Sequence, residues 1–264
     1  MTSIPPAEIW SLETTRLGQR VHVHDRLDST NTLALSLAHA PSNHGLVVLA
    51  REQNAGRGQY GRTWHAPAGS SVLMSLLLFP PTPLRRPALL TAWAAVSVCE
   101  AVLKLANLQA KIKWPNDVLV RGKKICGILI EQRTTGNAES PLASVVGIGL
   151  NITQTAAMFE QAQLPDAGAL AMFAEQPLAF DEVAKTLIRE LDAQYANLLA
   201  GDSATLESLW KWRLGLLGKM VLVEGIHQTT RGRLVDVTLD GIDLDIGGEI
   251  VRTSPESVRH IYAD

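Results

Sequence analysis

Residues 51–64, REQNAGRGQYGRTW, form a stretch rich in groups that bind anions. Glycine leaves backbone N–H groups free to turn toward a ligand, and the arginine guanidinium is a fixed fork of donors that fits carboxylate and phosphate oxygens. Apolar runs at residues 45–50 and 72–79 flank the stretch. We therefore expect a basic, glycine-hinged loop between two buried strands, which closes over an anionic ligand and excludes water. The loop contains Gly56, Gly58, Gly61, Arg51, Arg57 and Arg62.

Known phosphate-binding motifs do not explain this loop. Its Gly56-x-Gly58-x-x-Gly61 spacing matches the dinucleotide fingerprint, which needs a helix directly afterwards and an acidic residue ~20 positions on. Residues 62–67, RTWHAP, are a poor helix start, and two adjacent prolines stand where the acidic residue is needed. The sequence has no GxxxxGK[ST] loop, and no HRD or DFG follows. From the loop alone, a surface hairpin with incidental arginines is an equally good interpretation.

A second polar cluster, Asp28-Ser29-Thr30-Asn31, precedes a helical pattern at residues 32–40. Side chains of these types cap helices by accepting backbone N–H groups. Capping alone would explain the cluster. Its hydroxyl and amide groups can also reach a ligand at the start of the helix, so both interpretations stay open.

Further along, short extended segments surround the sequence KWPND, and two longer strands contain glycine. Glycine weakens a strand unless a ligand or another backbone must approach closely, so we expect such an approach here. The expected segments are strand 111–114, the turn Pro115-Asn116-Asp117, strand 118–120, a basic hairpin turn at 121–124, strand 125–132 with Gly127, a polar loop at 134–141, and strand 142–150 with Gly147 and Gly149, followed by Asn151.

The remaining pattern predicts helices around these strands. Residues 87–106 begin with a proline suited to a first helical turn and repeat apolar positions at helical spacing, so Trp93 is expected in the core. A helix at 181–199, capped by its first residue, and another at 204–214 follow. Residues 153–177 show no clear pattern.

An early strand at residues 20–25 places His22 and His24 on one face, opposite Val21 and Val23. No third metal ligand lies nearby in the sequence. We therefore expect both histidines at exposed positions.

The pattern changes after Gly215, where short β runs are separated by glycines. This is typical of a small barrel of roughly 50 residues. We expect one domain at 1–214 and a second at 215–264. The expected strands are 219–224, 229–239, 242–246 and 249–253.

Composition limits the class of protein. The 264 residues are 46% hydrophobic and 19% charged, as in ordinary soluble globular proteins. A net charge of −2 and a pI of about 6.4 argue against a general nucleic-acid binder. Cys99 and Cys126 belong to no CxxC motif, so buried thiols are expected. There is no signal peptide, and Glu100 and Lys104 interrupt the longest apolar helix, so we expect a cytoplasmic protein that does not enter a membrane.

Four motifs stand in one order: GRGQYGRTW, KWPNDVLV, CGILIE and GIGLN. The chain resembles the biotin–protein ligases, whose members carry GRGRxGRxW, KWPNDL, a GGILVE-like strand and GIGIN in the same order. The segment around Gly248-Glu249-Ile250 resembles the small SH3-like domain of that family. The resemblance covers nearly the whole chain. It implies an α+β fold with a mixed β-sheet catalytic domain, helices mainly on one face, and a C-terminal SH3-like β-barrel.

The resemblance also implies a two-step reaction with biotin, ATP and Mg²⁺. Biotin and MgATP give biotinyl-5′-AMP and pyrophosphate, and a lysine ε-amine of a biotin carboxyl carrier protein then attacks the mixed anhydride. In the first step a carboxylate attacks an anionic phosphate, so fixed positive charge must offset the repulsion. Two unit charges ~4 Å apart interact by roughly 4 kcal/mol at an effective dielectric of ~20, so a few cations can supply several powers of ten in rate.

By the same resemblance, Lys113 and Arg57 are expected to be catalytic, with Lys113 following the carboxylate and the α-phosphate through the transition state. No metal ligand is assigned. The residues expected to bind biotin are Ser29, Thr30, Asn31, Gln53, Arg57, Gly58, Gln59, Lys113, Trp114 and Gly127. The residues expected to bind the nucleotide are Gly56, Arg57, Arg62, Trp64, Asn116, Asp117 and Asn151.

Some positions depart from the family pattern. Gln59 stands where the family usually has Arg, so weaker retention of the adenylate is expected. Leu73 stands where an aromatic residue is common, and the adenine-covering segment after Asn151 matches poorly, so adenine contacts are unassigned. The residues before position 20 are too few for the winged helix-turn-helix of some members, so we expect no DNA binding. A monomer or weak homodimer is expected.

Two other functions remain as alternatives. Lipoate–protein ligases and octanoyltransferases share the catalytic fold but lack the GRGRxGR loop, and the acid that supports adenylation would distinguish them. A non-catalytic biotin-binding regulator is the second alternative. The presence of Lys113 argues against it.

Overall fold

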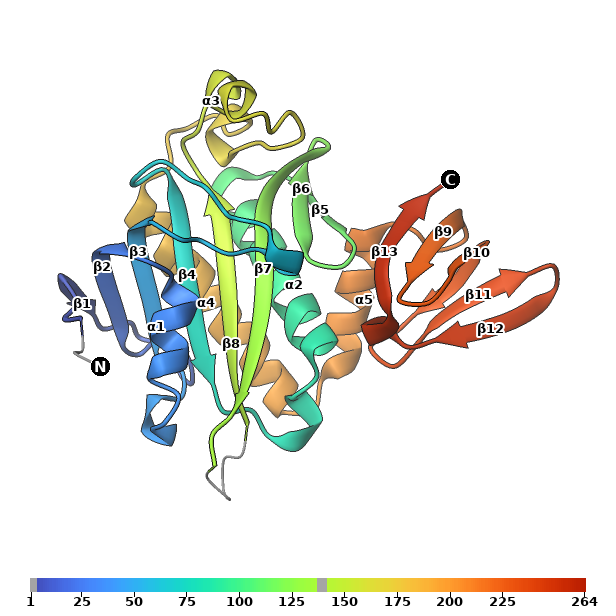
Figure 1. Ribbon diagram of the computed structural model, residues 1–264, viewed down its shortest axis with the longest axis horizontal. Coiled ribbons are helices and arrows are strands. Elements are labelled where there is room, and N and C mark those ends of the chain that lie inside the picture. The colour runs from blue at the N-terminus through green and yellow to red at the C-terminus, as the bar shows by residue number, and fades with distance from the viewer. Residues whose placement is uncertain (1–3, 137–141) are drawn as a thin grey trace.

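The computed structural model describes residues 4–136 and 142–264. A large β-sheet with helices packed on it forms the main body, and a smaller sheet follows at the carboxyl end (Figure 1). The large sheet consists of β1 (Glu8–Trp10), β2 (Val21–Leu27), β3 (Val47–Gln53), β4 (Ser71–Leu78), β5 (Ala110–Lys113), β6 (Asp117–Val120), β7 (Lys123–Thr134) and β8 (Leu142–Asn151). The small sheet consists of β9 (Met220–Gly225), β10 (Thr229–Val237), β11 (Ile242–Ile246), β12 (Glu249–Thr253) and β13 (Val258–Ala263).

The large sheet is mixed. Its eight strands lie in the order β1-β2-β3-β4-β8-β7-β6-β5, and only the β2–β3 ladder among the described strands is parallel. The small sheet is antiparallel throughout, in the order β12-β11-β10-β9-β13. The long central strands β4, β8 and β7 place the glycine-containing motifs side by side.

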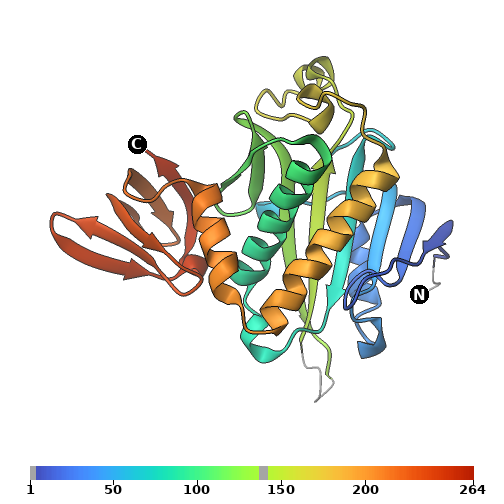
Figure 2. The same cartoon turned by 180° about the vertical axis from the view of Figure 1, so that it is seen from behind.

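Three helices cover one face of the large sheet, as Figure 2 shows: α2 (Pro87–Ala106), α4 (Phe180–Leu199) and α5 (Ser203–Leu214). By length and composition α2 could cross a membrane, but here it is a core helix, with 72% of its most apolar window buried. Trp93 on α2 is fully buried, as predicted. The short helix α1 (Thr30–Ser36) packs on the opposite face (Figure 1), and α3 (Ala156–Gln161) lies beyond the ends of β7 and β8.

The small sheet is fixed to the main body by direct contacts. Trp114 Nε1 donates a hydrogen bond to the carbonyl oxygen of Val258 at 3.1 Å, and its ring lies 5.5 Å from that of Trp210 on α5. Lys211 pairs with Asp236 at 2.7 Å. Since Trp114 belongs to the KWPND turn, the start of β13 is held beside that turn.

The predicted fold class, α+β with a mixed sheet and helices mainly on one face, is confirmed. Most predicted strands and helices are present within a few residues of their expected bounds. The elements not predicted are β1, β13 and α3, which are short or irregular. The predicted polar loop at 134–141 falls mostly outside the described residues.

The prediction that both histidines of the early strand are exposed is wrong for His24, which is 2% exposed, and His22 is half-buried. The reason is that β2 is covered on both faces: Val21 and Val23 enter the main core, and His24 lies beside Ala50 of β3 on the other face. Burial lowers the pKa of His24.

The start of α1 also differs from its prediction. The helix covers 30–36 rather than 32–40, so Thr30 and Asn31 form its first turn. Ser29 is the N-cap residue, but its side chain makes no capping hydrogen bond. The backbone N–H of Thr30 donates instead to Gln53 Oε1 at 2.7 Å, so capping alone does not explain the cluster.

Two further local predictions are corrected. The N-cap of α4 is Ala179, so Asp181 lies in the first helical turn, where its charge favours the helix dipole. Lys123 and Lys124, predicted in a hairpin turn, begin β7, and the turn consists of the two residues before them.

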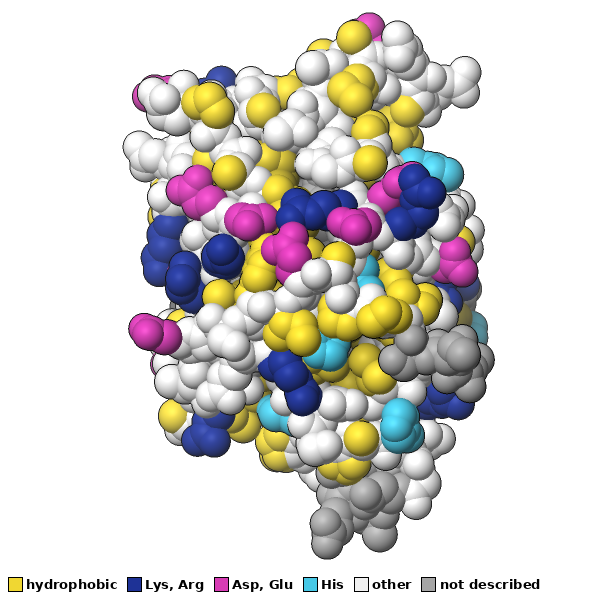
Figure 3. Space-filling model, turned by 90° about the vertical axis from the view of Figure 1, so that its left-hand side faces the viewer, with side chains coloured by type: hydrophobic (Ala, Val, Ile, Leu, Met, Phe, Trp, Pro, Cys, Tyr) yellow, Lys and Arg dark blue, Asp and Glu magenta, His cyan; other side chains and the backbone are white. Residues whose placement is uncertain are grey.

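Figure 3 views the molecule from the β1 side, where acidic and basic side chains are interspersed. Arg51 pairs there with Glu8 at 3.1 Å and lies 3.8 Å from Asp181 of α4. These pairs connect the edge strand to the helix layer. Interspersed charge is a common way to keep a sheet edge from pairing with another chain.

Candidate active site

Three glycines, Gly127, Gly147 and Gly149, leave one face of the large sheet without side chains at these positions. We call this part of the sheet the glycine floor. Gly127 on β7 pairs directly with Gly149 on β8, and Leu129 pairs with Gly147. Residues two apart on a strand face the same side, so Gly147 and Gly149 leave side chains missing from one face. This face is the one on which α1 lies.

The indole of Trp64 lies against the glycine floor. A Cβ atom at Gly149 would come within 2.6 Å of Trp64 Cε2, and one at Gly127 within 3.0 Å of Trp64 Cζ3. A close approach to these glycines is therefore present, but a side chain makes it, whereas a ligand or another backbone was predicted. Trp64 Nε1 is buried and has no hydrogen-bond partner among the described residues. Because Trp64 also lines the cavity described below, its N–H is a candidate donor to a bound ligand.

The first turn of α1 packs against the floor at Gly147. A Cβ atom at Gly147 would come within 2.9 Å of Asn31 Cγ, so only glycine leaves room for this side chain. Ser75 Oγ donates to Asn31 Oδ1 at 2.5 Å, and Thr30 Oγ1 donates to Gln53 Oε1 at 3.1 Å. The polar ends of these buried side chains therefore meet at one end of the floor.

A cavity of about 390 Å³ lies over the floor and is bordered by residues from all four sequence motifs. Gly56, expected at the nucleotide, does not line this cavity. It is buried where the loop folds on itself, and a Cβ atom there would come within 3.0 Å of Gln53 Nε2. All the other predicted site residues line the cavity: Ser29, Thr30, Asn31, Gln53, Arg57, Gly58, Gln59, Arg62, Trp64, Lys113, Trp114, Asn116, Asp117, Gly127 and Asn151.

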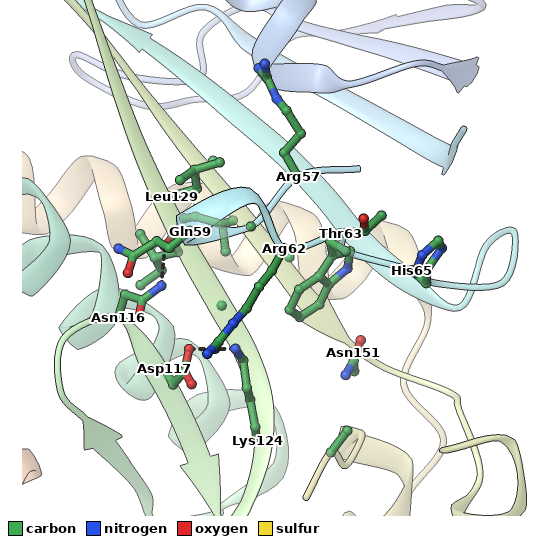
Figure 4. Close-up of a pocket in the computed structure, with 18 of the residues that line it drawn as sticks. Arg57, Gln59, Arg62, Thr63, His65, Asn116, Asp117, Lys124, Leu129 and Asn151 are labelled. Carbon is green, nitrogen blue, oxygen red and sulfur yellow. Dashed lines mark hydrogen bonds and ion pairs between the residues drawn. The ribbon is translucent and has the colours of Figure 1, made fainter. Parts of the chain in front are cut away.

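Cations surround one carboxylate at the far end of the floor. Lys124 Nζ pairs with Asp117 Oδ1 at 2.7 Å and lies 5.8 Å from the ring of Trp64. Figure 4 shows Arg62 reaching from the loop toward the same pair. Lys113 lies opposite Asp117 in the β5–β6 ladder and also lines the cavity. Three cationic side chains and one carboxylate give this end of the cavity a net positive charge.

Sequence reasoning did not assign Lys124 to the site. A β-bulge in the β6–β7 pairing places Asp117 opposite Gly127 but Leu119 opposite Lys124. The bulge changes the alternation of faces, so Lys124 reaches the cavity although it lies three residues before Gly127. Nothing in the sequence RGKKICG marks the bulge.

Arg57 is held away from this positive end. Its Nη2 pairs with Glu131 Oε2 at 2.9 Å, and the same oxygen accepts a hydrogen bond from Asn31 Nδ2 at 2.7 Å. Figure 4 shows the Arg57 side chain pointing away from Arg62 and Lys124. Glu131 was not predicted as part of the site, and it connects the loop to α1.

Other segments complete the walls. Tyr60 and His65 come from the loop, Phe159 and Leu164 from the segment after β8, and His260 and Tyr262 from β13. Sequence reasoning missed all six. Phe159 and Leu164 lie in a region without a clear pattern, and β13 was not predicted.

The two cysteines are inert in this environment. Burial raises the pKa of the Cys99 thiol to about 12 and raises that of Cys126 further, although Cys126 precedes Gly127 of the floor. Both were predicted as buried thiols, which is confirmed. Within residues 4–136 and 142–264, no three His, Cys, Asp or Glu side chains form a metal-binding group.

The fold and this site define the class of protein. The model of the biotin/lipoate A/B protein ligase family matches residues 23–151, which include the loop, the KWPND turn and the glycine floor. Because relatives of at least 30% identity align over most of their own length, the chain belongs to this family.

The relatives belong to one branch of the family. The biotin–[acetyl-CoA-carboxylase] ligase of Paracoccus denitrificans is 34% identical over 239 residues, covering 86% of this chain and 92% of that protein. The ligase of the same name from Mycobacterium tuberculosis is 30% identical over 269 residues, covering 97% of each. The bifunctional ligase/repressor BirA of Bacillus subtilis is 30% identical over 256 residues, covering 96% of this chain and 75% of that protein. The predicted membership of the biotin–protein ligases is confirmed.

A solved structure gives the same fold. The biotin protein ligase from Aquifex aeolicus, in complex with biotin and ATP, superimposes with a TM-score of 0.76 over 92% of this chain and 99% of that chain, at 21% identity. Its apo structure superimposes with a TM-score of 0.73 at 19% identity. At these identities the likeness concerns the fold.

Proposed function

We propose that the chain activates biotin with ATP to biotinyl-5′-AMP and transfers the biotin to a lysine of a biotin carboxyl carrier protein, such as that of acetyl-CoA carboxylase. One observation carries the proposal: a single cavity joins a hydrogen-bonding end at Asn31 to a cationic end at Lys124 across the glycine floor. Such a cavity suits a molecule with a polar head, an apolar chain and an anionic tail. The names of the closely aligned relatives support the same reaction.

In the first step the biotin carboxylate attacks the α-phosphorus of ATP, and the bond to pyrophosphate breaks. Arg62, Lys113 and Lys124 offset the charge that accumulates on the reacting oxygens. Lys113 is exposed on β5, whereas Lys124 is half-buried between Asp117 and Trp64.

At the other end, Thr30, Asn31 and Gln53 are preorganised to bind the biotin head. Thr30 Oγ1 is hydrogen-bonded to Gln53, and Asn31 is hydrogen-bonded to both Glu131 and Ser75. The N–H of Trp64 supplies one more donor over the floor. Trp114 lines the wall and also fixes β13, so it serves the pocket and the domain interface together.

Mg²⁺ enters as part of the MgATP substrate. Asp117 is the one carboxylate among the described residues that line the cavity, and Lys124 already neutralises it. The ion would therefore be held mainly by the phosphate oxygens of ATP, and Asp117 and Asn116 are the protein groups of suitable chemistry.

Pyrophosphate–ATP exchange tests the proposal, with biotin, lipoate and octanoate compared as the acid. Exchange with biotin and not with the other two is expected. Exchange with lipoate would instead assign the chain to the lipoate–protein ligases. A folded protein that binds biotin but supports no exchange would favour a non-catalytic regulator.

Lysine variants then test the site. Lys113→Ala and Lys124→Ala are each expected to slow exchange by on the order of 100-fold, as loss of a charge-stabilising group does. Lys123→Ala is the matched control, because Lys123 Nζ donates to the carbonyl oxygen of Pro165 and does not line the cavity. Full activity of Lys124→Ala would refute its role.

A further inference from the structure

We propose that His260, on the last strand of the small sheet, is the base that takes a proton from the acceptor lysine in the second step. The inference rests on the proposed function, because it assigns a residue to the transfer of biotin from the adenylate. The first step consumes no proton, so His260 has no part in it.

A β-bulge brings this histidine to the cavity. Along β13, regular alternation would place His260 on the same face as Val258, which is buried in the core. The pairing of β13 with β9 shifts by one residue at Arg259, so Val258 and Ile261 enter the core and His260 faces outward. Bulges re-aim side chains in this way beside active sites.

The strand is held firmly where the bulge begins. The carbonyl oxygen of Val258 accepts the hydrogen bond from Trp114 Nε1 at 3.1 Å, which fixes β13 against the KWPND turn. The ring of His260 lies 6.4 Å from that of Tyr60 on the glycine loop and 5.7 Å from that of Tyr262. His260 and both tyrosines line the cavity. The imidazole therefore stands where the loop and the small sheet meet, at the edge of the cavity.

Among the described residues, neither ring nitrogen of His260 has a hydrogen-bond partner. Glu224 lies directly across from it on β9 and can stabilise the imidazolium that forms. Lys113 and Arg62, which also line the cavity, favour the neutral amine over the ammonium. Histidine is also the side chain whose ordinary pKa lies nearest neutral pH.

The second step requires such a group. The acceptor amine is protonated at neutral pH, because the pKa of a free lysine is ~10.4, and only the neutral amine attacks. In the proposed step His260 takes one proton, the nitrogen bonds to the biotinyl carbonyl carbon, and the C–O bond to phosphate breaks. AMP leaves with the bonding electron pair, and the second proton on nitrogen passes to the departing phosphate or to water. The products are the biotinyl amide, AMP and the imidazolium.

The test separates the two steps. Pyrophosphate exchange with biotin measures adenylation, and a single turnover of preformed biotinyl-AMP with an apo biotin carrier protein measures transfer. His260→Gln is expected to slow transfer at neutral pH by on the order of 100-fold, within the usual range for a general base, and to slow exchange far less. Transfer by the wild type should level off with rising pH, while transfer by the variant should keep rising until the lysine itself deprotonates.

Two comparisons exclude a merely structural effect. Hydroxylamine is neutral near pH 7 and needs no base, so it should consume biotinyl-AMP at equal rates on both proteins. His227→Gln, in the β9–β10 turn of the same sheet, should transfer normally. His65→Gln tests the other histidine that lines the cavity. Thermal unfolding of His260→Gln, and of the second variant His260→Asn, checks that loss of the histidine leaves the protein folded.

Wild-type transfer by His260→Gln would overturn the proposal, and so would a slower variant with an unchanged pH profile. A defect in His65→Gln with none in His260→Gln would also overturn it. Absence of exchange in the wild-type chain would instead overturn the proposed function.

Discussion

The substitution Gly149→Ala tests whether the glycine floor exists to accept Trp64. The added Cβ would lie 2.6 Å from Trp64 Cε2 and 2.8 Å from Cζ2. Favourable carbon–carbon contacts lie at ~3.5–4.0 Å, so the indole must move by roughly 1 Å. Trp64 is on the loop and can lift away, whereas β8 is a central strand paired on both sides and cannot shift. We therefore expect the loop to move and the sheet to stay.

Gly149→Ala is expected to lower the rate of adenylation more than it lowers the stability of the fold. Overpacking costs about 1–3 kcal/mol when the neighbours are fixed, and each 1.4 kcal/mol is about tenfold in an equilibrium. If the displaced indole must return for the closed state to form, adenylation should fall by roughly tenfold to a hundredfold. The melting temperature should change little, because the open loop relieves the contact without unfolding the sheet.

The assay is pyrophosphate exchange with thermal unfolding alongside, in a double-mutant cycle. Trp64→Leu alone should reduce exchange through loss of the indole. Adding Gly149→Ala to Trp64→Leu should have almost no further effect, because the atoms that clash are gone. Strictly additive effects, or a large fall in melting temperature in Gly149→Ala with normal exchange, would refute the reasoning.

Further predictions concern pH, the loop and the thiols. Burial lowers the pKa of His24, His22 and His44, so the unfolded chain binds protons that the folded chain does not, and stability should be full above the ordinary histidine pKa of ~6.5 and fall as the pH drops below it. Melting curves down to about pH 5 check this, with a flat profile as the contrary result. Gln59→Arg should slow release of biotinyl-AMP by restoring a loop cation, and an unchanged off-rate would contradict it. Cys99 and Cys126 should resist iodoacetamide in the folded protein and react after denaturation, since buried thiols stay protonated.

The local chemistry of the chain could be predicted well. The proline at the start of α2, the apolar runs of β3 and β4, and the glycines of β7 and β8 act through their own backbone preferences or through the face they occupy. The motifs that gather around the cavity were predicted as a set from their resemblance to the biotin–protein ligases. Lys113, Asn116 and Trp64 line it because each adjoins an element whose type the sequence indicates.

The contributions of distant segments could not be predicted. Arg57 meets Glu131 across 74 positions of sequence, and Trp114 meets Val258 across 144. No local pattern in either segment indicates its partner, because the contact depends on how the strands are ordered in the sheet. His24 is buried for a related reason: a covering layer on each face of β2 depends on the whole fold.

By itself the sequence determined which segments are strands and helices, where glycine must admit another group, and which residue types gather near an anionic substrate. Only the tertiary structure decided which side chains face the cavity at its two ends. Bulges in the β6–β7 and β9–β13 pairings bring Lys124 and His260 to it. A shift of one residue moves a side chain to the opposite face of a sheet, and that shift is set by the partner strand rather than by the residues that it moves.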